Sequence, residues 1–419
     1  MRQVPAAWRG ALVLGIAGLV RGGAACAALP PALARWLNPD TAPFIPVPEI
    51  DVDPNSGTTL GLIPTWLVTN SKAQITKIIA PDVIHNPFFG WGVHGRIFAY
   101  PSKNTQWSVV ASVEQRVESQ FDYEFQTGLL RDSRWSFDAS VVYDRNGTPR
   151  FYGIGNNSPI IDETNYTKQQ KYIETTLGWN FTQVWQLAWT MRVREVAIQP
   201  GTLAKFASIQ TRFAGLLGIG ANHEILNRIE ISRDTRNDLT IPTRGGAYVL
   251  FGGVAASHGA VNDSLYSVVG FDGRQFWPLN RRTTLAAHVA LRYMPGEENV
   301  PFWSLSSIGG DRSVLGEEQP LRGYGAGRFY GRNSFSASVE YRRRVLSLNA
   351  MATHIEIELT PFIDLGEVFA NPRTLPFTHL HHVFGLGFRG IAPPFVVGYV
   401  DVGVGSEGPA VFTGINYPF

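Results

Sequence analysis

Apolar and polar residues alternate along most of this chain from residue 57 onward, in segments of roughly a dozen residues. A period of two is typical of a β-strand with one apolar and one polar face. In one such segment the polar face carries His354, Glu356 and Glu358, and the apolar face carries Ile355, Ile357 and Leu359. A single strand of this kind would also suit a soluble β-sandwich. Many long strands with this many charges on the polar face instead favour a water-filled lumen.

Composition favours the same fold class. The 419 residues include 43 Gly, 25 Phe, 14 Tyr and 11 Trp but only 4 Met and 1 Cys, which is typical of an all-β protein. Outside the N-terminus, no apolar run reaches the roughly 18 residues that a membrane-spanning helix requires. The sequence therefore predicts an all-β fold, a transmembrane antiparallel β-barrel. The formal net charge is +2, and three arginines lie in the first 21 residues. The rest of the chain is therefore close to neutral and lacks the excess of basic residues that nucleic-acid binding requires.

The N-terminal segment has the features of an export signal. Arg2 and Arg9 precede the apolar residues 11–20, and small residues follow around Cys26. We expect residues 1–28 to be a signal peptide that is removed on export. Lipidation of Cys26 stays open, although Gly23 stands where an aliphatic residue would be needed. Seven prolines in residues 29–56 predict an extended periplasmic linker. Residues 57–419 would form the barrel.

Turn residues divide the barrel into about sixteen strands, an even number as expected for a bacterial single-chain barrel. The strands are predicted at 57–70, 89–101, 105–117, 119–131, 134–145, 168–181, 184–197, 220–234, 245–257, 263–277, 282–294, 329–346, 353–369, 380–391, 394–405 and 408–419. The long connections 71–88, 146–167, 198–219 and 295–328 would then face outward. Further strands within 71–88 or 198–219 would raise the count to eighteen, and this alternative stays open.

Two short motifs about forty residues apart predict a functional contact. Leu321-Arg322-Gly323-Tyr324 lies in a glycine-rich stretch that can fold tightly, and Phe362-Ile363-Asp364-Leu365-Gly366 ends a strand whose polar face carries Asp364. A guanidinium placed in the lumen would find bidentate acceptors there. We therefore expect the extracellular loop 295–328 to fold into the barrel and to be held by Arg322 on Asp364, with Glu340 as a second acceptor. The alternative is a flexible surface loop.

These motifs resemble those of the BamA/TamA superfamily of outer-membrane barrels, also called the bacterial surface antigen family. Further similarity lies in Asp234-Thr235-Arg236 with Pro242 and Gly245, and in the Tyr152-Gly153-Ile154-Gly155 loop. The resemblance implies a bacterial outer-membrane location and an inward-folded loop carrying Leu321, Arg322, Gly323 and Tyr324. It also implies that Asp364, with Phe362 and Gly366 beside it, projects from the lumen wall. Residues 29–56 are too few for a periplasmic repeat domain, so the expected form is a barrel-only variant.

The C-terminal segment also suggests how the barrel is assembled. Val411, Thr413, Ile415, Tyr417 and Phe419 would share one face of the last strand, and the chain stops at an aromatic residue. Tyr417 and Phe419 thus resemble the C-terminal signal by which outer-membrane barrels are recognised for insertion. We expect this strand to meet the strand at 57–69 in a short seam, because Gly57, Gly61 and Pro64 weaken a ladder.

The predicted function is insertion or translocation of proteins, or transport of lipids, at the outer membrane. The expected partners are outer-membrane lipid, the barrel assembly machinery, and an unfolded protein client or a separate periplasmic partner. A passive or substrate-selective channel is the alternative, and an outer-membrane hydrolase is the least favoured. No enzyme motif, cofactor or metal site is predicted, because His379, His381 and His382 come without a carboxylate or a further ligand, and the acidic residues at 234–238 suit a turn.

Overall fold

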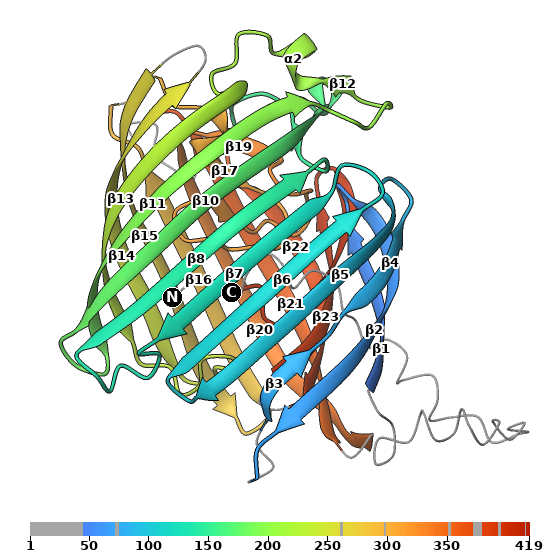
Figure 1. Ribbon diagram of the computed structural model, residues 1–419, viewed down its shortest axis with the longest axis vertical. Helices are drawn as coiled ribbons and strands as arrows, with labels where there is room; N and C mark the ends of the chain where they lie inside the picture. The colour runs from blue at the N-terminus through green and yellow to red at the C-terminus, as the bar shows by residue number, and fades with distance from the viewer. Residues whose placement is uncertain are drawn as a thin grey trace, which may run out of the picture.

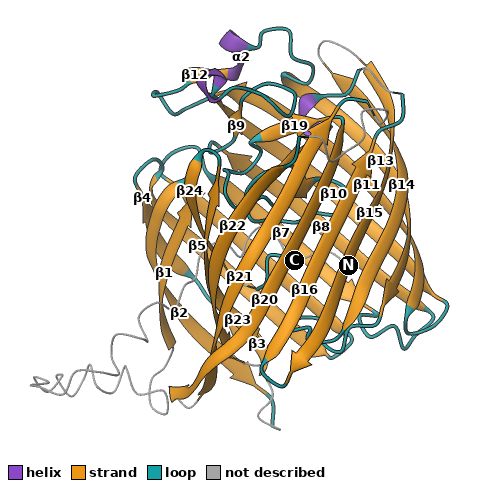
Figure 2. Cartoon of the chain, turned by 180° about the vertical axis from the view of Figure 1, so that it is seen from behind, coloured by secondary structure: helices purple, strands orange, loops and turns teal. Residues whose placement is uncertain are grey.

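The computed structural model describes residues 45–71, 75–259, 263–296, 299–350, 353–371, 379–392, 395–414 and 416–419. They form one large antiparallel sheet that curves into a barrel (Figures 1 and 2). The predicted signal peptide, Cys26 and the linker as far as residue 44 lie outside the described residues. Helices are short, and within the described ranges none is long and apolar enough to cross a membrane. The predicted all-β barrel is confirmed.

The wall strands follow one another in chain order, and those that pair in the wall are antiparallel. They are β1 (Ile45–Asp53), β2 (Gly57–Thr69), β3 (Ile75–Ile79), β4 (Asp82–Asn86), β5 (Gly90–Ser102), β6 (Thr105–Glu114), β7 (Ser119–Thr127), β8 (Trp135–Asn146), β10 (Thr164–Asn180), β11 (Trp185–Pro200), β13 (Gly220–Asp234), β14 (Gly245–Gly259), β15 (Asp263–Asn280), β16 (Thr283–Tyr293), β20 (Asn333–Ala350), β21 (Thr353–Phe369), β22 (His381–Ala392), β23 (Phe395–Gly405) and β24 (Gly408–Gly414).

The wall has more strands than the sixteen predicted. The main sheet has 21 strands among the described residues; two of them, β9 (Arg150–Phe151) and β12 (Ala207–Ser208), lie in loops, and β3 and β4 share one position because both pair with β2 and β5. Eighteen positions remain. One of the two additional positions is filled by β3 and β4, which cross the wall within 71–88, where a long outer loop was expected and further strands were the open alternative; Pro81 separates them.

The other additional strand, β1, lies inside the range predicted as linker. It pairs with β2 along its whole length, from Ile45 opposite Thr65 to Asp53 opposite Gly57. Pro46 and Pro48 are compatible with a strand here because β1 is an edge of the ladder, where a missing N–H leaves no neighbouring strand unpaired. The sheet therefore begins before residue 57. Adding two positions keeps the strand number even, so the later strands keep their predicted directions.

Connections differ between the two ends of the barrel. At the end that we call the long-loop end, at the top of Figure 1, the connections hold β9, the 3-10 helix Ile160–Asp162, β12, α2 (Ile209–Arg212), the 3-10 helix Phe302–Ser304, β17 (Ser306–Ile308), β18 (Glu318–Gln319) and β19 (Phe329–Gly331). At the other, short-turn end, connections such as 103–104 and 281–282 are brief. This asymmetry is typical of outer-membrane barrels.

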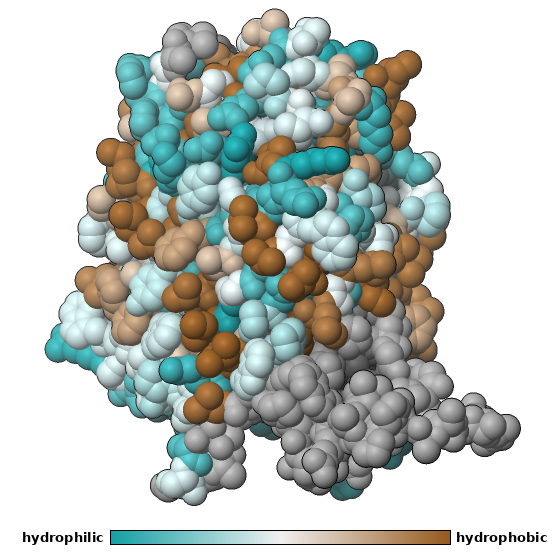
Figure 3. Space-filling model, turned by 45° about the vertical axis from the view of Figure 1, so that its right-hand side comes forward, coloured by the Kyte–Doolittle hydropathy of each residue, from teal (hydrophilic) through white to brown (hydrophobic). Residues whose placement is uncertain are grey.

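Burial is inverted relative to a soluble protein. Along β13, Ile225, Ile229 and Ile231 are exposed, whereas Glu224 and Arg228 are buried. The same inversion recurs around the wall, and Figure 3 shows hydrophobic residues across its outer face. A wall with apolar residues outside and charged residues inside is what a lipid environment selects. Functional side chains should therefore be sought in the lumen.

Candidate functional site

The loop between β16 and β20 lies inside the barrel rather than above it. Its strand β17 pairs in parallel with β18 and antiparallel with β19, forming a small sheet of its own. All three residues of β17 are buried. The loop then makes a tight turn in which the N–H of Tyr324 donates to the carbonyl of Leu321, 3.0 Å away. This turn brings Arg322 to the lumen wall.

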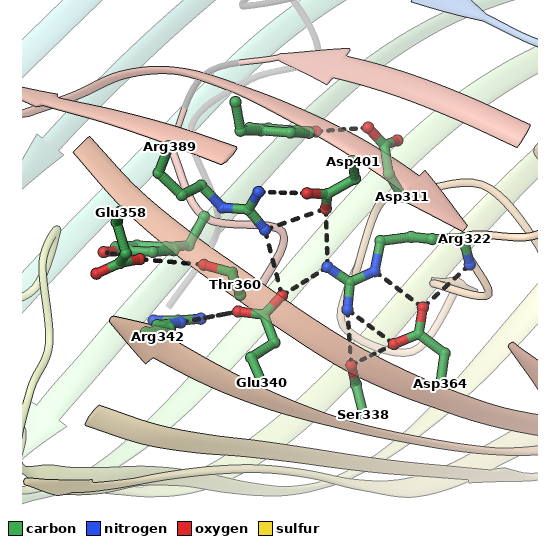
Figure 4. Close-up of polar contacts among 12 residues, drawn as sticks. Asp311, Arg322, Ser338, Glu340, Arg342, Glu358, Thr360, Asp364, Arg389 and Asp401 are labelled. Carbon is green, nitrogen blue, oxygen red and sulfur yellow. Dashed lines mark hydrogen bonds and ion pairs between the residues drawn. The ribbon is translucent and has the colours of Figure 1, made fainter. Parts of the chain in front are cut away.

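The Arg322 guanidinium is the centre of a buried polar network (Figure 4). Its Nε and Nη2 donate to the two oxygens of Asp364, each at 2.8 Å, and its backbone N–H donates to the same carboxylate at 3.1 Å. Its Nη1 donates to Glu340 at 2.5 Å and to Asp401 at 2.8 Å. Ser338 accepts a further bond from Nη2 at 3.0 Å. The five donor protons of one side chain are thus distributed over strands β20, β21 and β23.

We call Arg322, Ser338, Glu340, Asp364 and Asp401 the Arg322 lock. Every side chain in it is fully or almost fully buried. Burial alone would lower the pKa of Arg322, but the carboxylates of Asp364 and Glu340 outweigh it and hold the pKa above its usual value. A buried arginine that is fully paired in this way is costly to remove, because its partners would remain buried and charged.

Sequence reasoning placed Arg322 with Asp364 and Glu340, and the structure brings these three side chains together. It missed Asp401 on β23 and Arg389 on β22. Both oxygens of Asp401 also accept bonds from Arg389, whose Nη2 lies 3.4 Å from Glu340. The sequence signal that could have identified Asp401 and Arg389 is their place on the polar face of two glycine-rich strands, in which apolar and polar residues alternate. The convergence depends on the register across four strands, which a single sequence does not reveal.

Phe362 and Gly366, which flank Asp364 in its motif, contact the side chains of the inward loop. The Arg322 guanidinium carbon lies 3.6 Å from the centre of the Phe362 ring, a cation–π contact. A Cβ at Gly366 would lie 3.1 Å from Ile308 and 3.6 Å from Leu321, so glycine leaves room for both side chains. Leu321, Phe362 and Ile308 belong to one buried apolar cluster. The loop is therefore seated by packing as well as by charge.

Tyr324 fastens the loop to the hairpin between β23 and β24. Its hydroxyl lies 2.9 Å from the Ser406 hydroxyl and accepts the N–H of the same residue at 3.1 Å. A Cβ at Gly405 would meet the Tyr324 ring at 2.7 Å, and one at Gly323 would meet the backbone nitrogen of Gly405 at 2.6 Å. Glycine at these positions allows the loop and the wall to touch backbone to backbone.

Two further contacts join the loop to neighbouring connections. The Arg328 guanidinium pairs with Glu407, Nε to Oε1 at 2.8 Å, and donates to the carbonyl of Ser158 at 2.8 Å. Asn55, in the turn between β1 and β2, donates to the carbonyl of Ala326 at 2.9 Å. The inward loop thus contacts the connections on both sides of the junction between the first and last strands.

Comparison with known proteins agrees with these observations. Residues 103–388 match the model of the Omp85 superfamily domain. The chain belongs to the Omp85 superfamily. The predicted BamA/TamA-type resemblance is confirmed, and so is the bacterial outer-membrane location.

One solved structure supports the fold of this Omp85 barrel. BamA from Haemophilus ducreyi lacking POTRA domains 1-3 has a TM-score of 0.53 and 14% sequence identity, with 84% of this chain and 75% of that chain covered. CdiB from Escherichia coli has a TM-score of 0.48 and 10% identity, covering 88% and 62%. CdiB from Acinetobacter baumannii has a TM-score of 0.44 and 12% identity, covering 88% and 58%. No curated protein sequence matches the chain significantly.

The other residues that the sequence analysis singled out make specific contacts in the Omp85 barrel. Tyr152 packs under Arg328, whose guanidinium carbon lies 4.2 Å from its ring centre. Asn237 accepts the N–H groups of Thr243 and Arg244, as expected for turn chemistry. His381 stacks on Phe329 with ring centres 4.0 Å apart. Among the described residues, no three His, Cys, Asp or Glu side chains are grouped to hold a metal ion.

The C-terminal segment of the barrel differs from the prediction. Strand β24 ends at Gly414, and residues 416–419 are not part of the ladder. Tyr417 and Phe419 are buried in the lumen, at 9% and 4% exposure. Ile415 lies outside the described residues. The predicted continuous strand over 408–419 is therefore wrong, because the chain turns inward before its end; a role of Tyr417 and Phe419 as an insertion signal stays a prediction.

The seam of the barrel lies between β1 and β24, not between β2 and the last strand. The backbone N–H of Val52 donates to the Thr413 hydroxyl at 2.7 Å, and that hydroxyl donates to Asp51 at 3.0 Å. Within the described ranges no backbone ladder joins the two strands. The expected short seam thus has a different first strand, because β1 covers the edge of β2.

Proposed function

We propose that this protein inserts or translocates polypeptides at the outer membrane, with its lumen closed by its own loop. The observation that carries the proposal is the Arg322 lock. A passive pore has no need of a loop held in its lumen by a buried arginine, since such a loop obstructs diffusion. A barrel that keeps its loop fixed while a polypeptide uses another part of the structure would need this arrangement.

The seam between β1 and β24 supports the same proposal. Strands joined by a few side-chain bonds separate more easily than strands joined by a ladder, because each ladder pair contributes its own hydrogen bonds. An unpaired strand edge can in turn template a strand of another chain. The proposed client is accordingly an unfolded polypeptide that pairs at this edge. The barrel assembly machinery and a separate periplasmic partner remain proposals of the same kind.

Lipid transport and passive conduction are the competing functions. Passive conduction along the lumen would leave the seam closed, whereas polypeptide insertion at the edge requires it to open. We propose no enzymatic activity for this barrel.

A disulfide across the seam tests the proposal. Asp51→Cys with Thr413→Cys, in a Cys26→Ser background, places two thiols where the native side chains touch. Proteoliposomes holding the reduced protein should accelerate insertion of a urea-unfolded outer-membrane barrel client at least severalfold, and oxidation should abolish the gain. Asp51→Cys alone is the control and should be insensitive to oxidation. Unchanged acceleration after complete cross-linking would overturn the proposal.

A further inference from the structure

A buried arginine in the turn between β7 and β8 has only neutral hydrogen-bond acceptors. Arg131 is 6% exposed. Its guanidinium donates to the carbonyl of Val184 at 3.1 Å, to the hydroxyl of Ser232 at 3.0 Å and to Oε1 of Gln186 at 3.4 Å. In the part of the chain that the structure describes, it forms no ion pair with a carboxylate.

The turn holds Arg131 in a backbone conformation that residues with a side chain rarely adopt. Its φ is 52°, in the left-handed region, and its N–H donates to the carbonyl of Gly128 at 3.0 Å. Gly128 has a φ of 77°, and a Cβ there would lie 2.6 Å from the backbone of Ser136. Conformations of this kind cost stability and cluster at functional sites. Here the turn places a guanidinium against Ser232, on the buried face of β13.

The electrostatic environment of Arg131 is the opposite of that of Arg322. Burial lowers the pKa of Arg131, and the carboxylate of Asp234 does not compensate for it, in part because Arg236 adds positive charge nearby. Around Arg322 the carboxylates outweigh burial and raise the pKa. Buried charges in proteins are usually paired. An anion beside Arg131 would therefore stabilise the folded barrel.

Arg131 lines a pocket between the wall and the tip of the inward loop. Two further guanidiniums line it, from Arg236 in the turn before β14 and from Arg274 on β15, and Leu315 lines it from the loop. Ala247, which lies opposite Arg274 in the ladder, is also part of the lining. Because the side chain of Ala247 is a single methyl group, it leaves space beside the guanidinium of Arg274.

Positive charge exceeds negative charge in this pocket. Asp234 accepts bonds from Nε and Nη2 of Arg236, the second at 2.8 Å, and Asp272 lies 3.2 Å from Nε of Arg274. Two carboxylates therefore face three buried or half-buried guanidiniums. The guanidinium without a carboxylate is that of Arg131.

We propose that this pocket binds a phosphate group, as inorganic phosphate or as the headgroup of a phospholipid. The three hydrogen bonds of Arg131 use three of the five N–H donors of a guanidinium, so donors remain for a ligand. A tetrahedral phosphate accepts charge-assisted bonds from more directions than a planar carboxylate, and these guanidiniums come from two turns and a strand. The pocket lies at the short-turn end, which faces the periplasm in outer-membrane barrels. This inference does not depend on the proposed function.

Arg131 is the residue to substitute, because its bonds do not involve the inward loop. Arg274, in contrast, donates from Nη2 to the hydroxyl of Ser313 at 3.3 Å, so its loss would disturb the loop and the pocket together. Arg134 belongs to the same turn as Arg131 and is exposed. It provides a matched control for the removal of one positive charge.

Thermal unfolding tests whether the pocket takes phosphate, because a ligand of the folded state raises the transition temperature. In octyl glucoside micelles, inorganic phosphate should raise the transition temperature of the native protein beyond the effect of chloride at equal ionic strength, as followed by tryptophan fluorescence. Arg131→Gln should need at least tenfold more phosphate for the same rise, whereas Arg134→Gln should respond like the native protein. Equal responses of the two variants, or no phosphate-specific rise in the native protein, would overturn the proposal.

Ser232→Asp tests the same pocket by supplying the anion from the chain itself. The new carboxylate would replace a hydroxyl that already accepts a bond from Arg131. It should raise the transition temperature in the absence of phosphate and remove the response to phosphate. This variant also decides the matter if Arg131→Gln does not assemble. A Ser232→Asp protein that responds to phosphate as strongly as the native protein would contradict the proposal.

Dihexanoyl phosphatidylglycerol, titrated in the same micelles, distinguishes the two sources of the phosphate group. A half-maximal concentration at least tenfold below that of inorganic phosphate would support a lipid headgroup as the ligand, and the reverse order would support the free ion. In either case Arg131→Gln should weaken the response. A native protein that responds to neither compound has no phosphate site here.

Discussion

Arg322 and Asp364, 42 positions apart, share three hydrogen bonds: two from the guanidinium and one from the backbone N–H of the arginine. Because of the backbone bond, Asp364 positions the main chain of the loop in addition to pairing with the charge of Arg322. Glu340 and Asp401 complete the set, so the arginine faces three carboxylates. The consequences of removing each residue therefore differ.

Arg322→Ala should destabilise the barrel more than Asp364→Ala. Loss of the arginine leaves three buried carboxylates around an empty site, at a cost of about 3 to 5 kcal/mol, whereas loss of Asp364 leaves Arg322 with two carboxylates and the Ser338 hydroxyl as acceptors. The measurement is the temperature at which the folded, fast-migrating band is lost in heat-modifiability gels. Because the two residues act as one unit, the double variant should lose little more than Arg322→Ala alone. Simply additive losses would contradict the geometry.

Arg322→Lys should not restore native stability. A lysine ammonium is a point charge with three donors, and it cannot span Asp364, Glu340 and Asp401 in one plane as the guanidinium does. We expect an intermediate transition temperature in the same gels. A variant as stable as the native protein would show that a positive charge alone, without the planar set of guanidinium donors, holds the loop.

Gly403→Ala should weaken the lock without touching a charged residue. A Cβ at this position would lie 2.1 Å from the carbonyl oxygen of Arg322, so the loop or the strand must shift, at a cost of about 1 to 3 kcal/mol. Gly95→Ala is the matched control, since a Cβ there meets nothing within 4 Å. Equal transition temperatures for the two variants would show that the close contact between Gly403 and the Arg322 carbonyl does not limit stability.

Tyr324→Phe should have a smaller effect, because it removes only the hydroxyl that bonds Ser406. A loss of about 0.5 to 1.5 kcal/mol is expected, with faster proteolysis at the hairpin between β23 and β24. Tyr341→Phe, whose ring is 37% exposed on β20, is the control. Proteolysis at the same rate in both variants would show that the hydroxyl does not fasten the hairpin.

Sequence reasoning reached the barrel and the meeting of Arg322 with Asp364, because alternation and two compact motifs are local signals. It missed β1, because Pro46 and Pro48 argue against a strand unless the strand is known to lie at an edge. The inward turn of residues 416–419 was also missed, since Tyr417 and Phe419 continue the alternation of β24 although the ladder stops at Gly414. Arg389 and Asp401 could not be assigned, because their convergence depends on register between strands.

Conductance in planar bilayers tests the closed lumen most directly. The intact protein should show little steady conductance, and replacing residues 299–327 with a short glycine-serine linker should produce large, stable channels. Arg322→Ala should lie between the two, with frequent transient openings, because its loop is present but no longer pinned. Large and stable conductance from the intact protein would contradict the account and favour a passive channel.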